Sequence, residues 1–159
     1  HLYAPWRSNY IREKTAANDC PLCLTAAEQD AQKFVIKRFK HVYLMLNLYP
    51  YNAGHLMVIP FQHTGNLTDL TPEIQAELMH VAAISCTVLE KELGTDGFNI
   101  GLNMGGKASG GTIPEHLHLH VLPRFYGDTN FLPLLSNTKQ ISHDLPTLYE
   151  RLKKAFKAE

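Results

Sequence analysis

Three histidines alternate with aliphatic residues in the run from His116 to Leu122. Successive side chains of an extended strand point to opposite faces, so His116, His118 and His120 are predicted to share one face of a strand over 116–122. A row of imidazoles is costly to bury unless each ring has a partner, and a neutral imidazole can act as a nucleophile, proton carrier or metal ligand near neutral pH. The row therefore predicts a reactive site.

A glycine-rich loop, Gly105–Thr112, precedes the histidines. The backbone N–H groups of such a loop can surround a phosphate, because glycine permits positive φ and a close approach of the ligand. Lys107 would add a positive charge. Taken alone, the loop is equally typical of a flexible connection between strands. Beside the histidines, it predicts a site at which imidazole meets phosphate.

Cys20 and Cys23 have the C-x-x-C spacing of a zinc knuckle. Two thiolates supply half of a tetrahedral zinc site, so two further ligands are needed, and histidines can supply them. A redox-active C-x-x-C pair and isolated buried thiols remain alternative interpretations. The third cysteine, Cys86, falls in a predicted helix and is expected to be a small apolar core residue.

Length and composition favour one domain, 1–159, because 159 residues with 45% hydrophobic side chains can bury one sizeable core. Fifteen basic and fifteen acidic residues give a formal net charge of zero, so nucleic acid and anionic membranes are not expected partners. The apolar runs are too short to span a bilayer and no signal peptide is visible. With no evident disulfide framework, these features predict a reduced, cytoplasmic protein.

The elements that must position these residues indicate an α+β class. Local connections between strands favour antiparallel pairing, and the predicted strands are 34–39, 41–47, 54–60, 98–103 and 116–122. Thr71 and Pro72 begin a long helix that Gly94 ends. A short N-terminal helix that Thr25 could cap and a C-terminal helix beginning near Ser142 complete the prediction.

These features together resemble the histidine-triad family of nucleotide-binding proteins, whose signature alternates three histidines with hydrophobic residues. The likeness includes the segment Asn47–His55, the following run Leu56–Pro60 and the stretch 97–123, and it covers a core of about residues 20–124. It implies the fold of that family, an antiparallel five-stranded sheet with one long helix, a short N-terminal helix and a C-terminal helix.

The same resemblance implies roles for individual residues. His118 is expected to attack the α-phosphate of a nucleotide and form a nucleotidyl-histidine intermediate. His120 would donate a hydrogen bond to the phosphate or leaving group, and Thr112 would stabilise phosphoryl charge as a further catalytic residue. His55 would make a supporting hydrogen bond. Asn47 and Asn103 are expected to end adjacent strands, a position at which asparagines equally often only cap turns. The implied nucleotide-binding residues are Asn47, Asn103, Gly110, Gly111, Thr112 and His120.

A metal site is implied by likeness to the branch of the superfamily that includes galactose-1-phosphate uridylyltransferase. There, a C-x-x-C pair joins a histidine after the third strand and the first histidine of the motif around a structural metal. The residues at those places here are Cys20, Cys23, His63 and His116. The resemblance therefore implies a structural zinc ion and no organic cofactor.

The segments 2–11 and 123–133 resemble those that flank the core of bacterial diadenosine tetraphosphate phosphorylases within this family. This implies that phosphate attacks nucleotidyl-His118, so that diadenosine tetraphosphate gives ADP and ATP. Alternatives are hydrolysis of dinucleoside polyphosphates or nucleoside phosphoramidates, or a nucleotide-binding interaction protein. The family also implies a purine nucleotide or dinucleoside polyphosphate substrate and a homodimer in which the long helix and a central strand pair across a two-fold axis.

Overall fold

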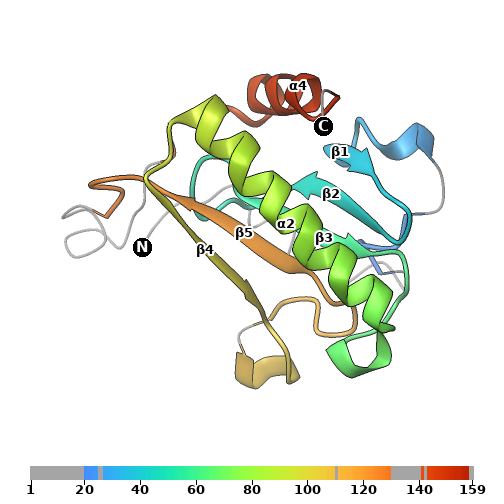
Figure 1. Ribbon diagram of the computed structural model, residues 1–159. Helices are drawn as coiled ribbons and strands as arrows, with labels where there is room; N and C mark the ends of the chain where they lie inside the picture. The colour runs from blue at the N-terminus through green and yellow to red at the C-terminus, as the bar shows by residue number, and fades with distance from the viewer. Residues whose placement is uncertain (1–19, 25–26, 110, 130–140, 142, 158–159) are drawn as a thin grey trace.

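The computed structural model describes residues 20–24, 27–109, 111–129, 141 and 143–157. Its centre is a five-stranded antiparallel sheet in the order β1-β2-β3-β5-β4 (Figure 1). The strands are β1 (Val35–Arg38), β2 (Val42–Leu46), β3 (Leu56–Pro60), β4 (Gly97–Leu102) and β5 (Leu119–Arg124). The α+β class and the predicted sheet are thereby confirmed.

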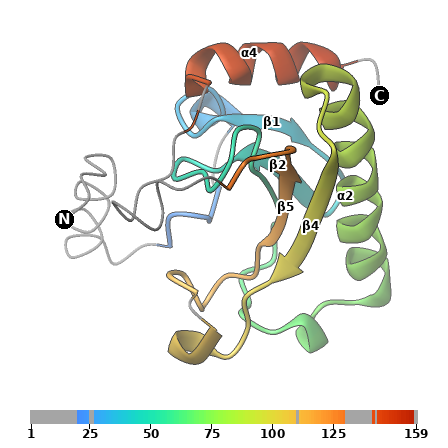
Figure 2. The same ribbon diagram turned by 90° about the vertical axis from the view of Figure 1, so that its left-hand side faces the viewer.

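Two helices pack with the sheet, α2 (Pro72–Leu93) across one face and α4 (Leu145–Ala155) near β1 and the end of α2 (Figures 1 and 2). Thr71 and Gly94 occupy the predicted cap positions of α2, although the Thr71 side chain makes no cap hydrogen bond. The predicted start of the C-terminal helix is early, because Asp144 is the N-cap and accepts a hydrogen bond from the Thr147 N–H at 3.0 Å.

Short 3-10 turns occupy several connections. In place of the predicted short N-terminal helix, the described residues contain one such turn, η1 (Ala27–Gln29), while Thr25 lies outside the described residues. The other two turns are η2 (Leu67–Asp69), before α2, and η3 (Gly106–Ser109), in the glycine-rich loop. In the described part of the chain, no helix has both the length and the apolar character that crossing a membrane requires.

Alternation along the strands divides the core into two layers. Even-numbered residues of β2 and β3, such as Leu44 and Val58, pack with α2 and α4, whereas Tyr43, Met57 and their odd-numbered neighbours form a second apolar cluster on the opposite face. Leu22 belongs to this second cluster. His120 of β5 pairs with Met57 in the strand register, so its side chain lies on the face opposite the helices.

The predicted strand over 116–122 is wrong at its start. β5 begins only at Leu119, because the N–H of Leu117 donates to the carbonyl of Thr64 at 2.7 Å and not to a neighbouring strand. The alternation itself is present, since Leu117, Leu119 and Val121 enter the core beneath α2. His118 and His120 point away from that core, with ring centroids 4.9 Å apart.

Candidate functional site

The connection between β2 and β3, residues 47–55, forms one wall of the site. Gly54 has a φ of 78°, a conformation that favours glycine, and a Cβ atom there would lie 2.6 Å from Leu93 and 3.1 Å from Leu89. Glycine therefore allows this turn to pack directly against the C-terminal end of α2. The result is that the His55 side chain is fully buried next to β5.

His118 has one ring nitrogen held by the backbone. Its Nδ1 lies 2.8 Å from the carbonyl oxygen of His116. A carbonyl oxygen only accepts hydrogen bonds, so Nδ1 carries a proton, and the neutral form of the ring has its lone pair on Nε2. The side chain is only 7% exposed, which limits competing contacts with water. The ring therefore has the protonation pattern that a nucleophile requires.

His120 and His55 form a second pair of imidazoles. The distance between His120 Nδ1 and His55 Nε2 is 2.9 Å, and the rings lie 5.0 Å apart. Burial and the neighbouring histidines lower the pKa of His55 to about 3, and burial together with His118 lowers that of His120 to about 4. Both rings are consequently neutral near pH 7.

Asn47 and Asn103 contact this pair from opposite sides. The expectation that they end adjacent strands is wrong, because β3 and β5 lie between β2 and β4. Asn47 Nδ2 lies 3.2 Å from His55 Nδ1, and Asn103 Nδ2 lies 3.3 Å from His120 Nε2. The structure thus brings both asparagines to the site, while their contact with a nucleotide stays a prediction.

The glycine-rich loop adjoins the same place, since a Cβ atom at Gly111 would lie 3.5 Å from the Cβ atom of Asn103. Thr112 is exposed at the end of the loop. Gly110 and the side chain of Lys107 lie outside the described part of the structure. The predicted roles of Gly110, Gly111 and Thr112 in binding phosphate therefore stay predictions.

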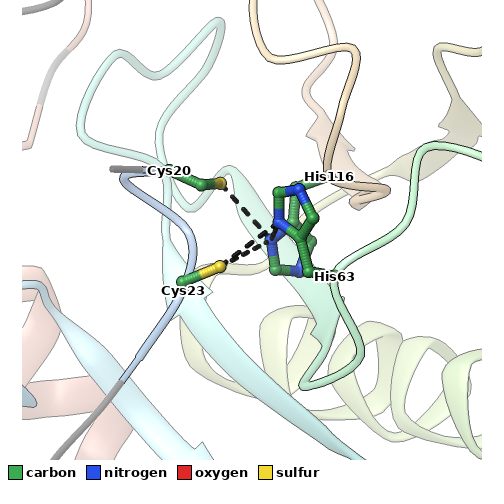
Figure 3. Close-up of side chains that lie close together, drawn as sticks. All are labelled: Cys20, Cys23, His63 and His116. Carbon is green, nitrogen blue, oxygen red and sulfur yellow. Dashed lines mark hydrogen bonds between the residues drawn. The ribbon is translucent and has the colours of Figure 1, made fainter. Parts of the chain in front are cut away.

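The side chains of four potential metal ligands converge, namely Cys20, Cys23, His63 and His116 (Figure 3). The Sγ–Nδ1 distances are 3.4 Å for Cys20–His116, 3.3 Å for Cys23–His63 and 3.6 Å for Cys23–His116. The two Nδ1 atoms lie 3.3 Å apart. Tetrahedral zinc would place S and N ligands about 3.6 Å apart and two N ligands about 3.3 Å apart. These four distances therefore fit a tetrahedral ion, and all four ligand atoms lie within 4.8 Å of one another.

The ring orientation of His116 also suits a metal ligand. Its Nε2 lies 2.9 Å from the carbonyl oxygen of Pro60 and must carry the proton, which leaves the Nδ1 lone pair directed into the cluster. Burial lowers the pKa of His116, so the ring is neutral, as ligation requires. Burial also raises the pKa of the Cys20 thiol, partly offset by the backbone N–H of Leu22.

Packing explains how ligands so distant in sequence meet. The Cys20–Cys23 turn is closed by a backbone hydrogen bond of 3.1 Å and is anchored by Tyr43, whose hydroxyl donates to the Leu22 carbonyl at 2.6 Å. Gly65 lies so close to Pro114 that a Cβ atom would overlap the Pro114 carbonyl oxygen. This close approach of two loops brings His63 to His116.

Sequence reasoning missed a polar network that holds the 47–55 connection to the end of β5. Asn52 Nδ2 donates to the Pro123 carbonyl at 2.9 Å and to Asp128 Oδ2 at 2.8 Å. Arg124 donates twice to Asp128 and, with further hydrogen bonds, holds the pKa of that carboxyl well below its usual range. An acidic residue four positions after an arginine was the available signal, although it is a common one.

Comparison with known proteins gives one family match and many similar structures. The family model described as "HIT domain" matches residues 28–127. The AP-4-A phosphorylase of Mycobacterium tuberculosis is 40% identical over 148 residues, which cover 88% of this chain and 75% of that protein. Cys20 and Cys23 precede the family match.

Two solved structures illustrate the similarity in three dimensions. A Zn-bound histidine triad family protein from Mycobacterium smegmatis has a TM-score of 0.66 at 31% identity, with 82% of this chain and 88% of that chain covered. The diadenosine triphosphate hydrolase of Plasmodium falciparum has a TM-score of 0.62 at 20% identity, with 80% and 76% covered. The second similarity concerns the fold alone.

Proposed function

This chain belongs to the HIT domain family, and from that premise we propose that it transfers a nucleotidyl group from a dinucleoside polyphosphate through a covalent bond to His118. The observation that carries the proposal is the hydrogen bond from His118 Nδ1–H to the His116 carbonyl. In the neutral form of the ring, this bond leaves the Nε2 lone pair as the nucleophilic atom and orients the side chain before substrate arrives.

In the first step, His118 Nε2 attacks the α-phosphorus of the substrate. A P–N bond forms as the P–O bond to the remaining nucleotide breaks, and that nucleotide leaves with the bonding electron pair. His120 stands beside His118 and would donate a hydrogen bond to the phosphate or to the leaving oxygen. Asn103 and the adjoining Gly111 would bind the nucleotide at the same place, with Thr112 and Gly110 completing the phosphate contacts.

In the second step, we infer that inorganic phosphate is the acceptor. A phosphate oxygen attacks the same phosphorus, the P–N bond breaks, and His118 is released. Diadenosine tetraphosphate would thus give ATP in the first step and ADP in the second. The proposal of phosphate follows from the 40% identity to a protein named AP-4-A phosphorylase, with water as the alternative acceptor.

We further propose that zinc is held by Cys20, Cys23, His63 and His116. Four ligand–ligand distances close to those of tetrahedral zinc support this assignment, and so does the Zn-bound relative from Mycobacterium smegmatis. Zinc bound there would be structural, because all four tetrahedral positions would be filled by protein ligands. A reducing cytoplasm, in which both thiols stay free to bind metal, remains part of this proposal.

Homodimer formation also remains a prediction. β4 lies at the edge of the sheet, and the described residues pair it with β5 alone. Ile100 and Met104 are 43% and 45% exposed on and after this strand. An open strand edge with exposed apolar side chains is compatible with pairing to a second copy, as the family resemblance implies. The mass of the protein in solution tests this directly.

The covalent intermediate is tested by intact-mass analysis of protein mixed with diadenosine tetraphosphate in the absence of phosphate. The wild-type protein should gain the mass of one adenylyl group, located on His118 by peptide sequencing. His118→Asn should gain none and should lose turnover by about 10³-fold or more. His80→Asn, which changes an exposed histidine of α2, should behave as wild type. Full turnover by His118→Asn would refute the nucleophile assignment.

A further inference from the structure

His55 is buried at the site, yet neither the nucleophile nor the metal cluster uses it. The ring is 0% exposed and contacts the backbone of Tyr51 and the side chain of His120 in β5. An imidazole that is neutral and fully buried has two nitrogens that need different partners, one a donor and one an acceptor. The partners of His55 therefore determine where its single proton lies.

Those partners are unambiguous on one side of the ring. The backbone N–H of Tyr51 points at His55 Nδ1 from 3.1 Å, and a backbone N–H can only donate. Asn47 Nδ2 approaches the same nitrogen at 3.2 Å, with its amide orientation fixed because Asn47 Oδ1 accepts from the Tyr49 N–H at 2.9 Å. His55 Nδ1 is thus an acceptor, and the proton must be on Nε2.

The proton on His55 determines the tautomer of its neighbour. His55 Nε2–H donates to His120 Nδ1 at 2.9 Å, so this nitrogen of His120 is an acceptor and the neutral ring carries its proton on Nε2. The opposite tautomer would require a proton on His55 Nδ1, directed against the Tyr51 N–H. Low pKa values of both rings agree with a chain of neutral imidazoles.

The contact with Asn103 does not change these proton positions on His55 and His120. Its Nδ2 lies 3.3 Å from His120 Nε2, so two donor groups would face each other in the tautomer derived above. Rotation of the Asn103 amide by 180° would present its carbonyl oxygen to the Nε2–H, and within the described residues the Asn103 side chain makes no other hydrogen bond that would oppose the rotation. The backbone N–H of Tyr51 cannot exchange donor for acceptor in this way. It therefore sets the direction of the hydrogen bonds from Tyr51 through His55 to His120.

We propose that His55 is a positioning residue that fixes His120 as an N–H donor toward the reacting phosphate, by way of the chain Tyr51 N–H, His55 and His120. Two histidines that are two positions apart in the sequence thereby receive opposite roles. His118 offers a lone pair because a carbonyl holds its Nδ1–H, whereas His120 offers an N–H because an imidazole donates to its Nδ1. This inference rests on the proposed nucleotidyl transfer for its consequence, although the hydrogen-bond chain itself does not.

The hydrogen-bond chain is tested first in the substrate-free wild-type protein, by two-bond ¹H–¹⁵N correlation spectra of ¹⁵N-histidine-labelled protein near pH 7. We expect the proton on Nε2 of His55 and His120, and on Nδ1 of His118. A proton on Nδ1 of His120 would overturn the inference. Because no substrate is present, this result is independent of whether the protein cleaves any nucleotide.

Two variants of His55 then separate positioning from packing. In His55→Gln, an amide can still accept from Tyr51 and donate to His120, so the Nε2–H tautomer of His120 should persist. In His55→Leu no donor remains, so His120 should populate both tautomers, and adenylylation of His118 in quenched-flow should slow by at least about 10-fold. An unchanged tautomer and rate in His55→Leu would overturn the inference. If that variant does not fold, the wild-type and His55→Gln spectra still decide it.

Discussion

The carbonyl oxygen of His116 lies 2.8 Å from Nδ1 of His118, while the side chain of His116 directs its own Nδ1 at Cys20 and Cys23. One residue therefore belongs to both sites, with its side chain in the metal cluster and its backbone against the nucleophile. Since the backbone of His116 is outside β5, sheet hydrogen bonds do not hold it. Its position is set instead by the hydrogen bond from His116 Nε2–H to Pro60, a long backbone hydrogen bond to the Ile113 carbonyl at 3.5 Å, and the contacts of its Nδ1 with the other three potential metal ligands.

Removal of one metal ligand should consequently affect both stability and the nucleophile. We expect Cys20→Ser to purify without zinc and to unfold at a markedly lower temperature, because structural zinc contributes on the order of 10 kcal/mol to folding. Adenylylation of His118 should slow, since the His116 carbonyl is held less firmly once zinc no longer binds the His116 ring. Elemental analysis and thermal unfolding measure the first two effects.

Cys86→Ser is the matched control for that variant, because Cys86 lies in α2 away from the four ligands. It should keep the zinc content of the wild-type protein. Wild-type protein that contains no zinc after purification without chelator would contradict the assignment of the cluster.

A methyl group at Gly54 should lower both the stability of the protein and its activity. Gly54→Ala adds strain at a φ of 78° and a clash with Leu93 and Leu89, so we expect a loss of about 2–5 kcal/mol in the free energy of unfolding. Activity should also fall in the folded fraction, because His55 follows directly. Urea denaturation measures the first effect.

Gly94→Ala controls for backbone strain alone. Gly94 also has a positive φ, 63°, but a Cβ atom there would meet nothing within 4 Å. The expected loss is about 1–2 kcal/mol, with activity unchanged. Equal losses of stability in the two variants would show that the packing of the 47–55 connection against α2 contributes nothing.

Part of the fold around the three histidines was predictable from local sequence patterns. The alternation over 116–122 correctly separates His118 and His120 from Leu117 and Leu119, because it depends only on backbone geometry. The start of β5 was not predictable, since the loop containing Thr64 captures the Leu117 N–H through tertiary packing. Local sequence carries no information about that competition.

The hydrogen-bond partners of His55 could not be predicted from the sequence either. Its role depends on the direction of one backbone N–H, that of Tyr51, and on a side chain 65 residues away. By contrast, the four members of the metal cluster were anticipated by family resemblance, and the structure brings all of them together. Residue types and spacing alone had supplied only the C-x-x-C half of that set.

Folding should become less favourable as the pH falls through the range set by the buried histidines. Unfolded histidines titrate near pH 6.5, whereas the folded pKa values are about 3 for His55 and about 4 for His120. Between about pH 4 and 6.5 the unfolded chain binds more protons, so the free energy of unfolding decreases as pH is lowered, by up to about 1.4 kcal/mol per pH unit for each ring. Above this range the stability is fully present.

His55→Gln removes one of these two rings and should reduce that slope. The comparison is made by urea denaturation of both proteins at a series of pH values, and loss of metal at low pH affects both alike. Parallel stability curves for wild type and His55→Gln would contradict a depressed pKa at His55.

The most direct test of the proposed reaction is product analysis of diadenosine tetraphosphate incubated with the protein and ³²P-labelled inorganic phosphate. Phosphorolysis through nucleotidyl-His118 predicts equal amounts of ADP and ATP, with the label in the β-phosphate of ADP and none in ATP. AMP and ATP without label would contradict phosphorolysis, because water and not phosphate would then be the acceptor.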